Sequence, residues 1–326
     1  MTISGRENVL FFYFTQTSQL PNGPPPAVCA AFPGLKRIFA GDFHTFCRYW
    51  GLRRIRTAMN QNKNLFSGKP QIFRTMLSVI AALLVYEAGK AAGLLLAGIL
   101  LEYGMTGGGG SGTVNEGLAG GLTNLIMILT GGLACFAVWK SSLDFRIKKK
   151  PAWKRTCVFI LLAASLSLGL NIIIAYLDLA RHSQTFQQVA QQQADVPLWL
   201  GICLYGIAAP LSEELVFRGI IYGKSKEIFG APAAMVFSGV VFGIYHANLV
   251  QGMYASLLGI MLAWVKERYG TLLAPVIFHG AGNLAVFLLI NVAGLGNVLA
   301  QPLVCAGLLA VSGVSFWYLF TRNAAA

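Results

Sequence analysis

The sequence predicts an all-α fold, namely a polytopic transmembrane helix bundle. Of its 326 residues, 56% are hydrophobic and only 11% are charged, whereas soluble domains carry about 25% charged residues. Several windows reach the roughly 20 apolar residues that a helix needs to cross a bilayer. No stretch has the alternation of polar and apolar residues that is typical of strands. The chain is therefore expected to be an integral multi-pass membrane protein, in the plasma membrane if the host is bacterial.

About eight membrane-spanning segments are expected, because the apolar runs are separated by polar or basic stretches. They cover residues 76–101, 118–139, 157–177, 197–222, 232–250, 253–265, 272–292 and 298–320. Lys and Arg cluster before the first run and after the second, fourth, sixth and eighth. Since basic loops stay in the cytoplasm, an eight-span chain with both termini cytoplasmic agrees with every loop. Topology thereby explains the formal net charge of +13, and no nucleic-acid partner is expected.

Four regions follow from this pattern. Residues 1–70 mix Pro, Gly, Asn and aromatic residues without periodicity, which predicts a poorly structured N-terminal arm. Residues 76–196 hold N-terminal transmembrane helices and loops, residues 197–292 a candidate catalytic core, and residues 298–326 the last helix and a tail. An alternative for the arm is that Met59 is the true start of translation.

Two features of the N-terminal half have a structural explanation. Glu87 and Lys90 interrupt the first apolar run at i,i+3 spacing, so they can face each other on one side of a helix. A structural ion pair is favoured over a catalytic role. The glycine-rich run at 107–112 lacks the GxxxxGK[ST] pattern and no clear strand precedes it. A flexible linker is therefore favoured over a phosphate-binding loop.

Three polar islands interrupt the apolar runs between residues 197 and 292. They are Glu213, Glu214 and Arg218, then His246, then His279 and Asn283. An Asp, Glu or Arg at the centre of a membrane helix costs at least about 2.5 kcal/mol, so such residues usually face a bundle interior and mark a functional path. The three islands are therefore expected to converge on one intramembrane hydrolytic site.

Helical spacing separates the roles of the two glutamates. Glu214 and Arg218 are at i,i+4 and share one face, whereas Glu213 is rotated by about 100 degrees. Arg218 is expected to neutralise and orient Glu214. Glu213 is then left to point into a cavity, where a low-dielectric environment makes a carboxylate a better base toward water.

The histidines and the amide complete the expected chemistry. His246 is expected to help hold and deprotonate the same water. His279 and Asn283, again at i,i+4, project from one face and are expected to donate hydrogen bonds to a developing oxyanion. The alternative is a zinc site, in which Glu213, His246 and His279 supply three ligands and a water the fourth. Taken singly, each residue also has a structural explanation, as a helix–helix hydrogen bond or an intrahelical bridge.

The three islands resemble the motifs of the CPBP family. These are the CAAX proteases and bacteriocin-processing enzymes, also called the ABI family, and they include the type II CAAX prenyl endopeptidases. The motifs occur in the family's order, as EExxxR from Glu213, FxxxH from Phe242 and HxxxN from His279, over about residues 197–292. The resemblance implies an intramembrane endopeptidase in which Glu213 and His246 activate water while His279 and Asn283 form the oxyanion site.

The resemblance also implies a membrane-embedded or lipidated peptide as substrate, within the lipid bilayer. The family has been described both as metal-dependent and as glutamate-type proteases, and the lack of an HExxH motif favours the metal-free mechanism. Residues 1–196 lie outside the resemblance. A non-enzymatic alternative stays open: an ion- or proton-coupled transporter, or a membrane immunity protein that binds a partner.

Truncation tests the start of the chain. A protein that begins at Met59 is expected to insert and act like the full-length chain, because residues 1–58 contain no expected spanning segment. Membrane insertion and activity of the two forms, expressed at matched levels, are the measurements. Loss of either on deletion of residues 1–58 would show that the arm is a working part of the protein.

Overall fold

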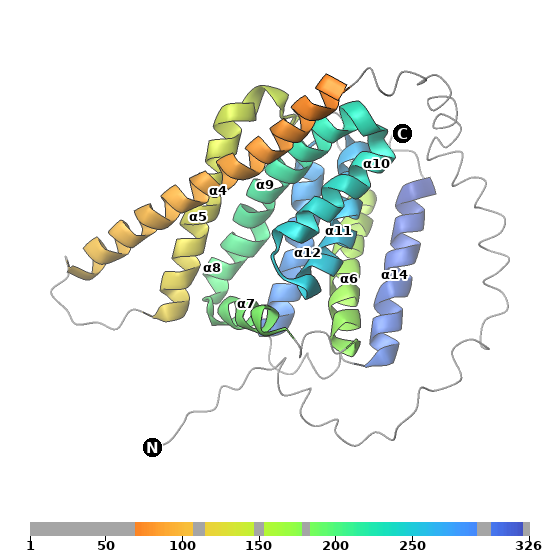
Figure 1. Ribbon diagram of the computed structural model, residues 1–326. Helices are drawn as coiled ribbons and strands as arrows, with labels where there is room; N and C mark the ends of the chain where they lie inside the picture. The colour runs from red at the N-terminus through yellow and green to blue at the C-terminus, as the bar shows by residue number, and fades with distance from the viewer. Residues whose placement is uncertain (1–68, 107–114, 147–152, 178–182, 292–300, 322–326) are drawn as a thin grey trace. The chain divides into compact units, whose positions relative to one another are not determined.

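The computed structural model describes residues 69–106, 115–146, 153–177, 183–291 and 301–321 (Figure 1). Within these ranges the chain is helical and contains no strand, as predicted. The helical elements are α4 (Lys69–Thr106), α5 (Glu116–Trp139), η1 (Lys140–Ser142), α6 (Trp153–Tyr176), α7 (Gln184–Asp195), α8 (Leu198–Cys203), η3 (Leu204–Ala208), α9 (Ala209–Glu214), η4 (Leu215–Ile221), α10 (Tyr222–Tyr245), α11 (Leu249–Tyr269), α12 (Leu273–Asn291) and α14 (Pro302–Thr321). The expected N-terminal arm, with Met59, and the glycine-rich linker lie outside the described residues.

Six of the described helices are long and apolar enough to cross a membrane. One is a continuous run of 48 residues, Leu198–Tyr245, and a shorter apolar segment, Leu273–Leu289, lies in α12. Because the long run bends in the middle and supplies two spans, each of the eight expected runs has a helical counterpart. The all-α, multi-pass membrane architecture is confirmed. The cytoplasmic placement of both termini stays a prediction.

The bend in the long run lies at Gly230, whose φ of 73° and ψ of 167° are not helical. Glycine adopts a positive φ without the steric cost that a side chain would add. Pro232, two residues later, has no N–H to donate into the preceding turn. These two residues separate the fourth and fifth predicted spans inside a helix that otherwise continues without a loop.

The predicted end of the fifth span at Val250 is wrong. Helix α10 ends at Tyr245, and Val250 already belongs to α11. The chain reverses at Ala247, a non-glycine residue with a φ of 56°. Asn248 then caps α11, because its side-chain oxygen accepts a hydrogen bond of 2.7 Å from the backbone N–H of Gln251. The hydrophobicity pattern does not indicate this tight reversal, because apolar residues continue on both sides of it.

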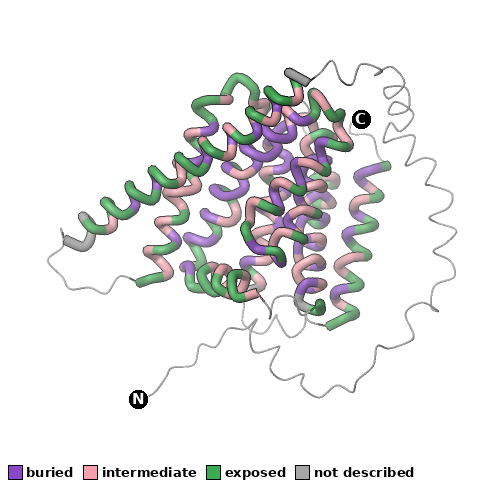
Figure 2. The backbone as a smooth tube through the Cα atoms, viewed as in Figure 1, coloured by how far each residue is buried: buried purple, intermediate pink, exposed green. Residues whose placement is uncertain are grey.

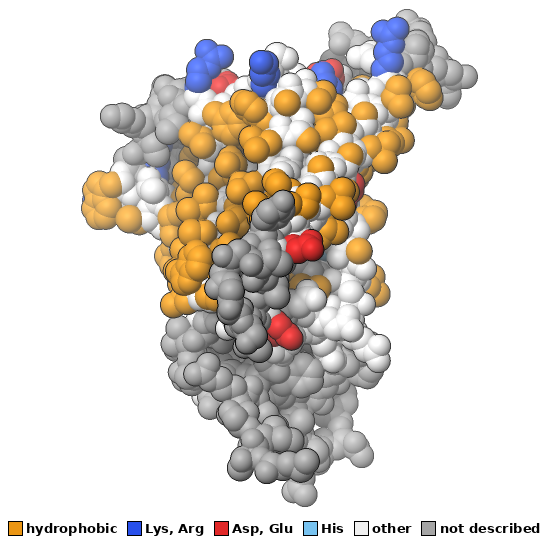
Figure 3. All heavy atoms as spheres, turned by 90° about the vertical axis from the view of Figure 1, so that its left-hand side faces the viewer, with side chains coloured by type: hydrophobic (Ala, Val, Ile, Leu, Met, Phe, Trp, Pro, Cys, Tyr) orange, Lys and Arg blue, Asp and Glu red, His pale blue; other side chains and the backbone are white. Residues whose placement is uncertain are grey.

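The run from α8 to α10 lies at the centre of the described helices. Buried residues concentrate along it in Figure 2, and Phe217 and Ile221 of η4 have no exposed surface. Helix α4, by contrast, presents apolar side chains such as Leu84 and Leu95 to the outside, at 65% and 71% exposure. Figure 3 shows the apolar surface on this side of the molecule. In a bilayer, such side chains face lipid.

The ion pair expected between Glu87 and Lys90 is present, with Lys90 Nζ 3.1 Å from Glu87 Oε1. Tyr245, the last residue of α10, joins it, because its hydroxyl donates to Glu87 Oε1 while accepting from Lys90 Nζ at 2.9 Å. The ammonium group also lies over the Tyr245 ring, 5.2 Å from its centroid. The pair therefore fastens α4 to the end of α10, one residue before His246.

Helices α10 and α11 approach closely at two glycines. A Cβ atom placed on Gly259 would lie 2.8 Å from the Cα of Gly239 and 3.0 Å from Nη2 of Arg218. Gly259 thus permits both the helix contact and the position of the arginine, whose Nη2 donates to the Gly259 carbonyl at 3.0 Å. Small residues at helix contacts are the usual means of close packing in membranes.

Substitution at Gly259 tests this contact. Gly259→Ala is expected to destabilise the fold by about 1–3 kcal/mol, because the added methyl group has no room. Gly307→Ala is the matched control, since a Cβ there would meet nothing within 4 Å and alanine favours helix by about 0.5–1 kcal/mol. Thermal denaturation of both variants in detergent is the measurement. Equal stability of the two variants would contradict the close approach.

Candidate active site

Glu214 and Arg218 form a fully buried ion pair. Oε1 of Glu214 accepts a hydrogen bond of 2.9 Å from Nη1 of Arg218, and neither side chain has exposed surface. The guanidinium group lies over the Phe242 ring, 4.4 Å from its centroid, and donates to the Gly259 carbonyl. Arg218 therefore contacts α10 and α11 as well as its own helix, and the pairing expected from the i,i+4 spacing is present.

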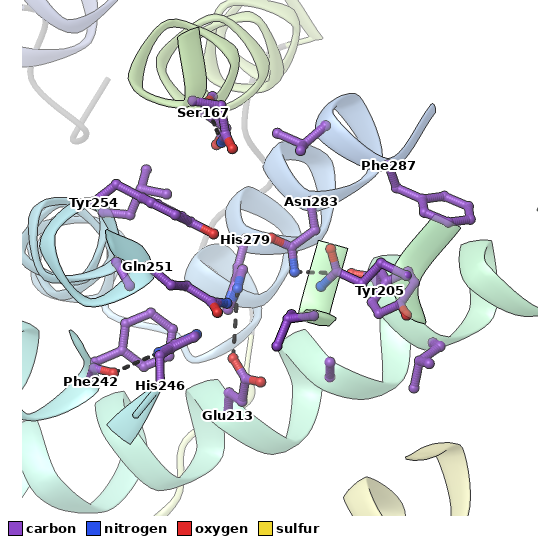
Figure 4. Close-up of a pocket in the computed structure, with 18 of the residues that line it drawn as sticks. Ser167, Tyr205, Glu213, Phe242, His246, Gln251, Tyr254, His279, Asn283 and Phe287 are labelled. Carbon is purple, nitrogen blue, oxygen red and sulfur yellow. Dashed lines mark hydrogen bonds and ion pairs between the residues drawn. The ribbon is translucent and has the colours of Figure 1, made fainter. Parts of the chain in front are cut away.

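His279 lies between the two glutamates. Its Nδ1 is 2.8 Å from Oε1 of Glu214, and its Nε2 is 3.8 Å from Oε2 of Glu213 (Figure 4). Because the Glu214 carboxylate is held as an acceptor by Arg218, Nδ1 is the donor in this contact. This leaves Nε2 facing Glu213. Sequence reasoning missed the bond to Glu214, because the two residues are 65 positions apart on different helices.

The two adjacent glutamates occupy different environments. The Glu214 side chain is completely buried, whereas that of Glu213 is 17% exposed and lines the pocket. This is the division that helical rotation predicts for neighbouring residues. The Glu213 carboxylate is thus accessible from the pocket, while Glu214 acts only on Arg218 and His279.

His246 is the C-cap residue of α10, and a backbone contact fixes its ring. Its Nδ1 lies 2.8 Å from the carbonyl oxygen of Phe242. A carbonyl oxygen only accepts, so Nδ1 donates, and in the neutral ring Nε2 is then an acceptor. The strained backbone of Ala247 follows directly, and strain of this kind persists where the surrounding structure over-determines it, often at functional sites. His246 is therefore held at the edge of the pocket with one nitrogen available.

The side chain of Asn283 is oriented by a backbone carbonyl that has no hydrogen-bond donor in its own helix. Its Nδ2 donates to the carbonyl oxygen of Tyr205 at 3.3 Å. In the π-helical segment η3 the Ala209 N–H bonds to the carbonyl of Leu204 instead, and the residue five positions after Tyr205 is Pro210, which has no N–H. The Tyr205 carbonyl therefore has no donor from its own helix, and Asn283 supplies one. π-Helical turns are frequent at functional sites for this reason among others.

These side chains line one pocket with a volume of about 340 Å³. Glu213, His246, His279 and Asn283 all face it, while Glu214 and Arg218 lie behind it. Figure 4 shows the side chains of Glu213, His246 and His279 turned toward the same space. The six residues predicted from the sequence are thus close together. Four of them line the pocket, and the other two lie behind its wall.

Other polar residues of the pocket were missed from the sequence. They are Asn124 of α5, Asn171 of α6, Gln192 and Gln193 of α7, and Gln251 and Tyr254 of α11. Figure 4 shows Gln251 and Tyr254 reaching toward His279. Asn124 and Asn171 interrupt apolar runs just as the three islands do, so the same signal was present. Uncharged amides are less costly in a membrane helix than charges, and the signal is correspondingly weaker.

The side chains do not fit the alternative zinc site. Within the described ranges, no group of three His, Cys, Asp or Glu side chains is placed to hold a metal ion. A catalytic zinc needs three such donors that converge to within about 2.0–2.2 Å of one point. Asn283 is a neutral amide and adds no anionic donor to the set. The chemistry derived below therefore passes through no metal ion.

Residues 195–285 match the family model described as "Type II CAAX prenyl endopeptidase Rce1-like". The "Putative membrane peptidase YdiL" of Bacillus subtilis (strain 168) is 31% identical over 101 residues, which are 31% of this chain and 41% of that protein. The "UPF0177 protein YxdF" of Lactococcus lactis subsp. lactis (strain IL1403) is 26% identical over 137 residues, 42% of this chain and 75% of that protein. No solved structure matches the chain.

The matched region contains every residue of the three polar islands, from Glu213 to Asn283. The similarity to the first relative spans less than half of that protein's length. The motifs, the family match and the two relatives agree with one another. Residues 195–285 are thus similar to the type II CAAX prenyl endopeptidases, the group to which the three motifs also point.

Proposed function

We propose that this protein is an intramembrane endopeptidase that hydrolyses a peptide bond of a membrane-embedded or lipidated peptide. The observation that carries the proposal is the chain of contacts Arg218–Glu214–His279–Glu213, which ends at an accessible carboxylate inside a membrane helix bundle. The family match of residues 195–285 and a relative named as a membrane peptidase support the same class of reaction. Within the part of the chain that the structure describes, no Asp, Glu, Lys or Arg other than Glu213 lines the pocket.

Glu213 is the proposed general base. A water held between the Glu213 carboxylate and Nε2 of His246 gives a proton to Glu213 as its oxygen attacks the scissile carbonyl carbon. The proton then passes from Glu213 to the leaving amine nitrogen, and the carbon–nitrogen bond breaks. Proton and charge are balanced without any further reactant.

His279 and Asn283 are the proposed stabilisers of the oxyanion. The Asn283 amide has two N–H donors, and one is used on the Tyr205 carbonyl, which sets the direction of the other. His279 donates through Nδ1 to Glu214, so its Nε2 donates to the oxyanion in the doubly protonated form of the ring. Donors fixed in advance stabilise developing charge without reorganisation, and losing one costs about 2.7–4 kcal/mol.

A pair of substitutions separates catalysis from support. Glu213→Gln is expected to abolish turnover and leave the yield of folded protein nearly intact, because this side chain is partly exposed and carries no ion pair within 3.5 Å. Arg218→Ala is expected to lower folded yield, because an unpaired buried charge costs about 3–5 kcal/mol. Peptide cleavage and the monodisperse yield of purified protein are measured for both. Similar loss of yield in the two variants would refute this division.

Metal dependence is the subject of a separate prediction. Activity is expected to survive a strong chelator, because the proposed steps use only protein side chains and water. Asn283→Ala is expected to lower kcat by about 10²–10³-fold, the usual effect of removing one oxyanion donor. The metal content of purified wild-type protein is measured alongside. Stoichiometric zinc that is lost together with activity in His279→Ala would establish the zinc mechanism instead.

A further inference from the structure

Apart from Lys90 and Arg218, which form ion pairs within the bundle, the basic side chains of the described helices lie toward one end. Arg155 lies at the start of α6, Lys224 and Lys226 follow the Glu–Arg segment, and Lys266 and Arg268 end α11. Lys and Arg side chains gather along the upper edge in Figure 3. At the other end, the described residues of α5, α7, α8 and α14 include no Lys or Arg within their terminal turns. By the positive-inside rule, this second end faces away from the cytoplasm.

The pocket extends toward that second end. Asn171 of α6 lines it and lies 16 residues beyond Arg155, a distance of about 24 Å along a helix. Val286 and Phe287, in the last turns of α12, also line it. Helix α7, which contributes Gln192 and Gln193 to the lining, lies crosswise at this end in Figure 1. The pocket thus runs from the glutamates toward the end of the bundle at which the described helices carry no Lys or Arg.

Amide side chains line the way from α7 to the glutamates. Gln192 and Asn124 are exposed, whereas Gln193, Asn171 and Gln251 are half-buried. The side chains of Asn124, Gln192 and Gln193 make no hydrogen bond with any described residue. An exposed amide inside the apolar α5 is costly in lipid, and an amide offers both a donor and an acceptor, as a peptide backbone does.

An extended substrate would need such partners. A peptide bond is reached only when its helix is unwound, and each backbone group left unpaired in the bilayer costs several kcal/mol. Among the described residues, the lining contains no Lys or Arg, the side chains that usually bind a carboxylate such as the C-terminus of a peptide. The set of amides therefore fits the backbone of an internal, extended segment.

We propose that the substrate is an extended peptide segment that enters past α7 from the non-cytoplasmic side and is held through its backbone by the amides of the pocket. This inference rests on the proposed peptidase function. It assigns Asn124, Asn171, Gln192 and Gln193 to substrate binding, and it assigns the cleaved bond to a position inside the substrate chain.

The side of entry is tested by labelling, which requires no activity. Gln192→Cys and Lys226→Cys are made in the full-length chain, and the unsubstituted chain sets the background from native cysteines. In intact cells, a membrane-impermeant maleimide is expected to label Gln192→Cys, and to label Lys226→Cys only after permeabilisation. The reverse pattern would overturn the proposed route even if the protein is a peptidase.

The substrate class is tested with two membrane reporters that carry the same cleavable segment on opposite sides of the bilayer. Glu213→Gln serves as the inactive control. Only the non-cytoplasmic reporter is expected to be cleaved. The Asn124→Leu variant is expected to raise KM about fivefold or more, because one hydrogen bond to the substrate is lost. Its kcat is expected to change little. Cleavage of the cytoplasmic reporter alone, or an unchanged KM, would refute the inference and leave the peptidase function standing. Cleavage of neither reporter by the wild type would refute both.

Discussion

The buried ion pair between Glu214 and Arg218 is the interaction on which the rest of the site depends. Arg218 reaches the Gly259 carbonyl of α11 and the Phe242 ring of α10, while Glu214 accepts from His279 of α12. One pair thus joins α9 and η4 to α10, α11 and α12. Neither side chain has exposed surface. A movement of these helices would therefore separate the two charges and leave each of them unpaired inside the bundle. The position of the pocket in the fold follows from this constraint.

Burying this pair is costly, and its surroundings explain how the fold tolerates it. Desolvating two charges costs several kcal/mol per ion, and their attraction offsets this only when further hydrogen bonds satisfy the remaining atoms. The backbone carbonyl, the aromatic face and the imidazole provide most of that compensation, although Glu214 Oε2 and Arg218 Nε have no hydrogen-bond partner among the described residues. A hydrophobic pair of similar volume would pack there at less cost. The charges are consistent with a role in orienting His279 rather than in stabilising the bundle.

Local departures from the α-helix present the remaining groups. The π-helical turn η3 and Pro210 together leave the Tyr205 carbonyl for Asn283. The reversal at Ala247 ends α10 at Tyr245, so that the Phe242 carbonyl is available to fix the imidazole of His246. In each case a backbone group without its usual helical partner orients a side chain of the pocket. A regular helix would satisfy these carbonyls internally and leave both side chains free to rotate.

The sequence by itself determined the class of the molecule and predicted candidates for its centre. Apolar runs of sufficient length define membrane helices, and a charged or polar residue inside such a run is conspicuous. Six candidates were therefore identified from the sequence, namely Glu213, Glu214, Arg218, His246, His279 and Asn283. The spacing within one helix also predicted the Glu214–Arg218 pair. Only the tertiary structure placed His279 between the two glutamates, moved the end of the fifth span to Tyr245 and added amides from α5, α6 and α7 to the pocket. Helical periodicity fixes which residues share a face of one helix. It does not fix which face of another helix meets them, because that depends on the packing of all the helices together.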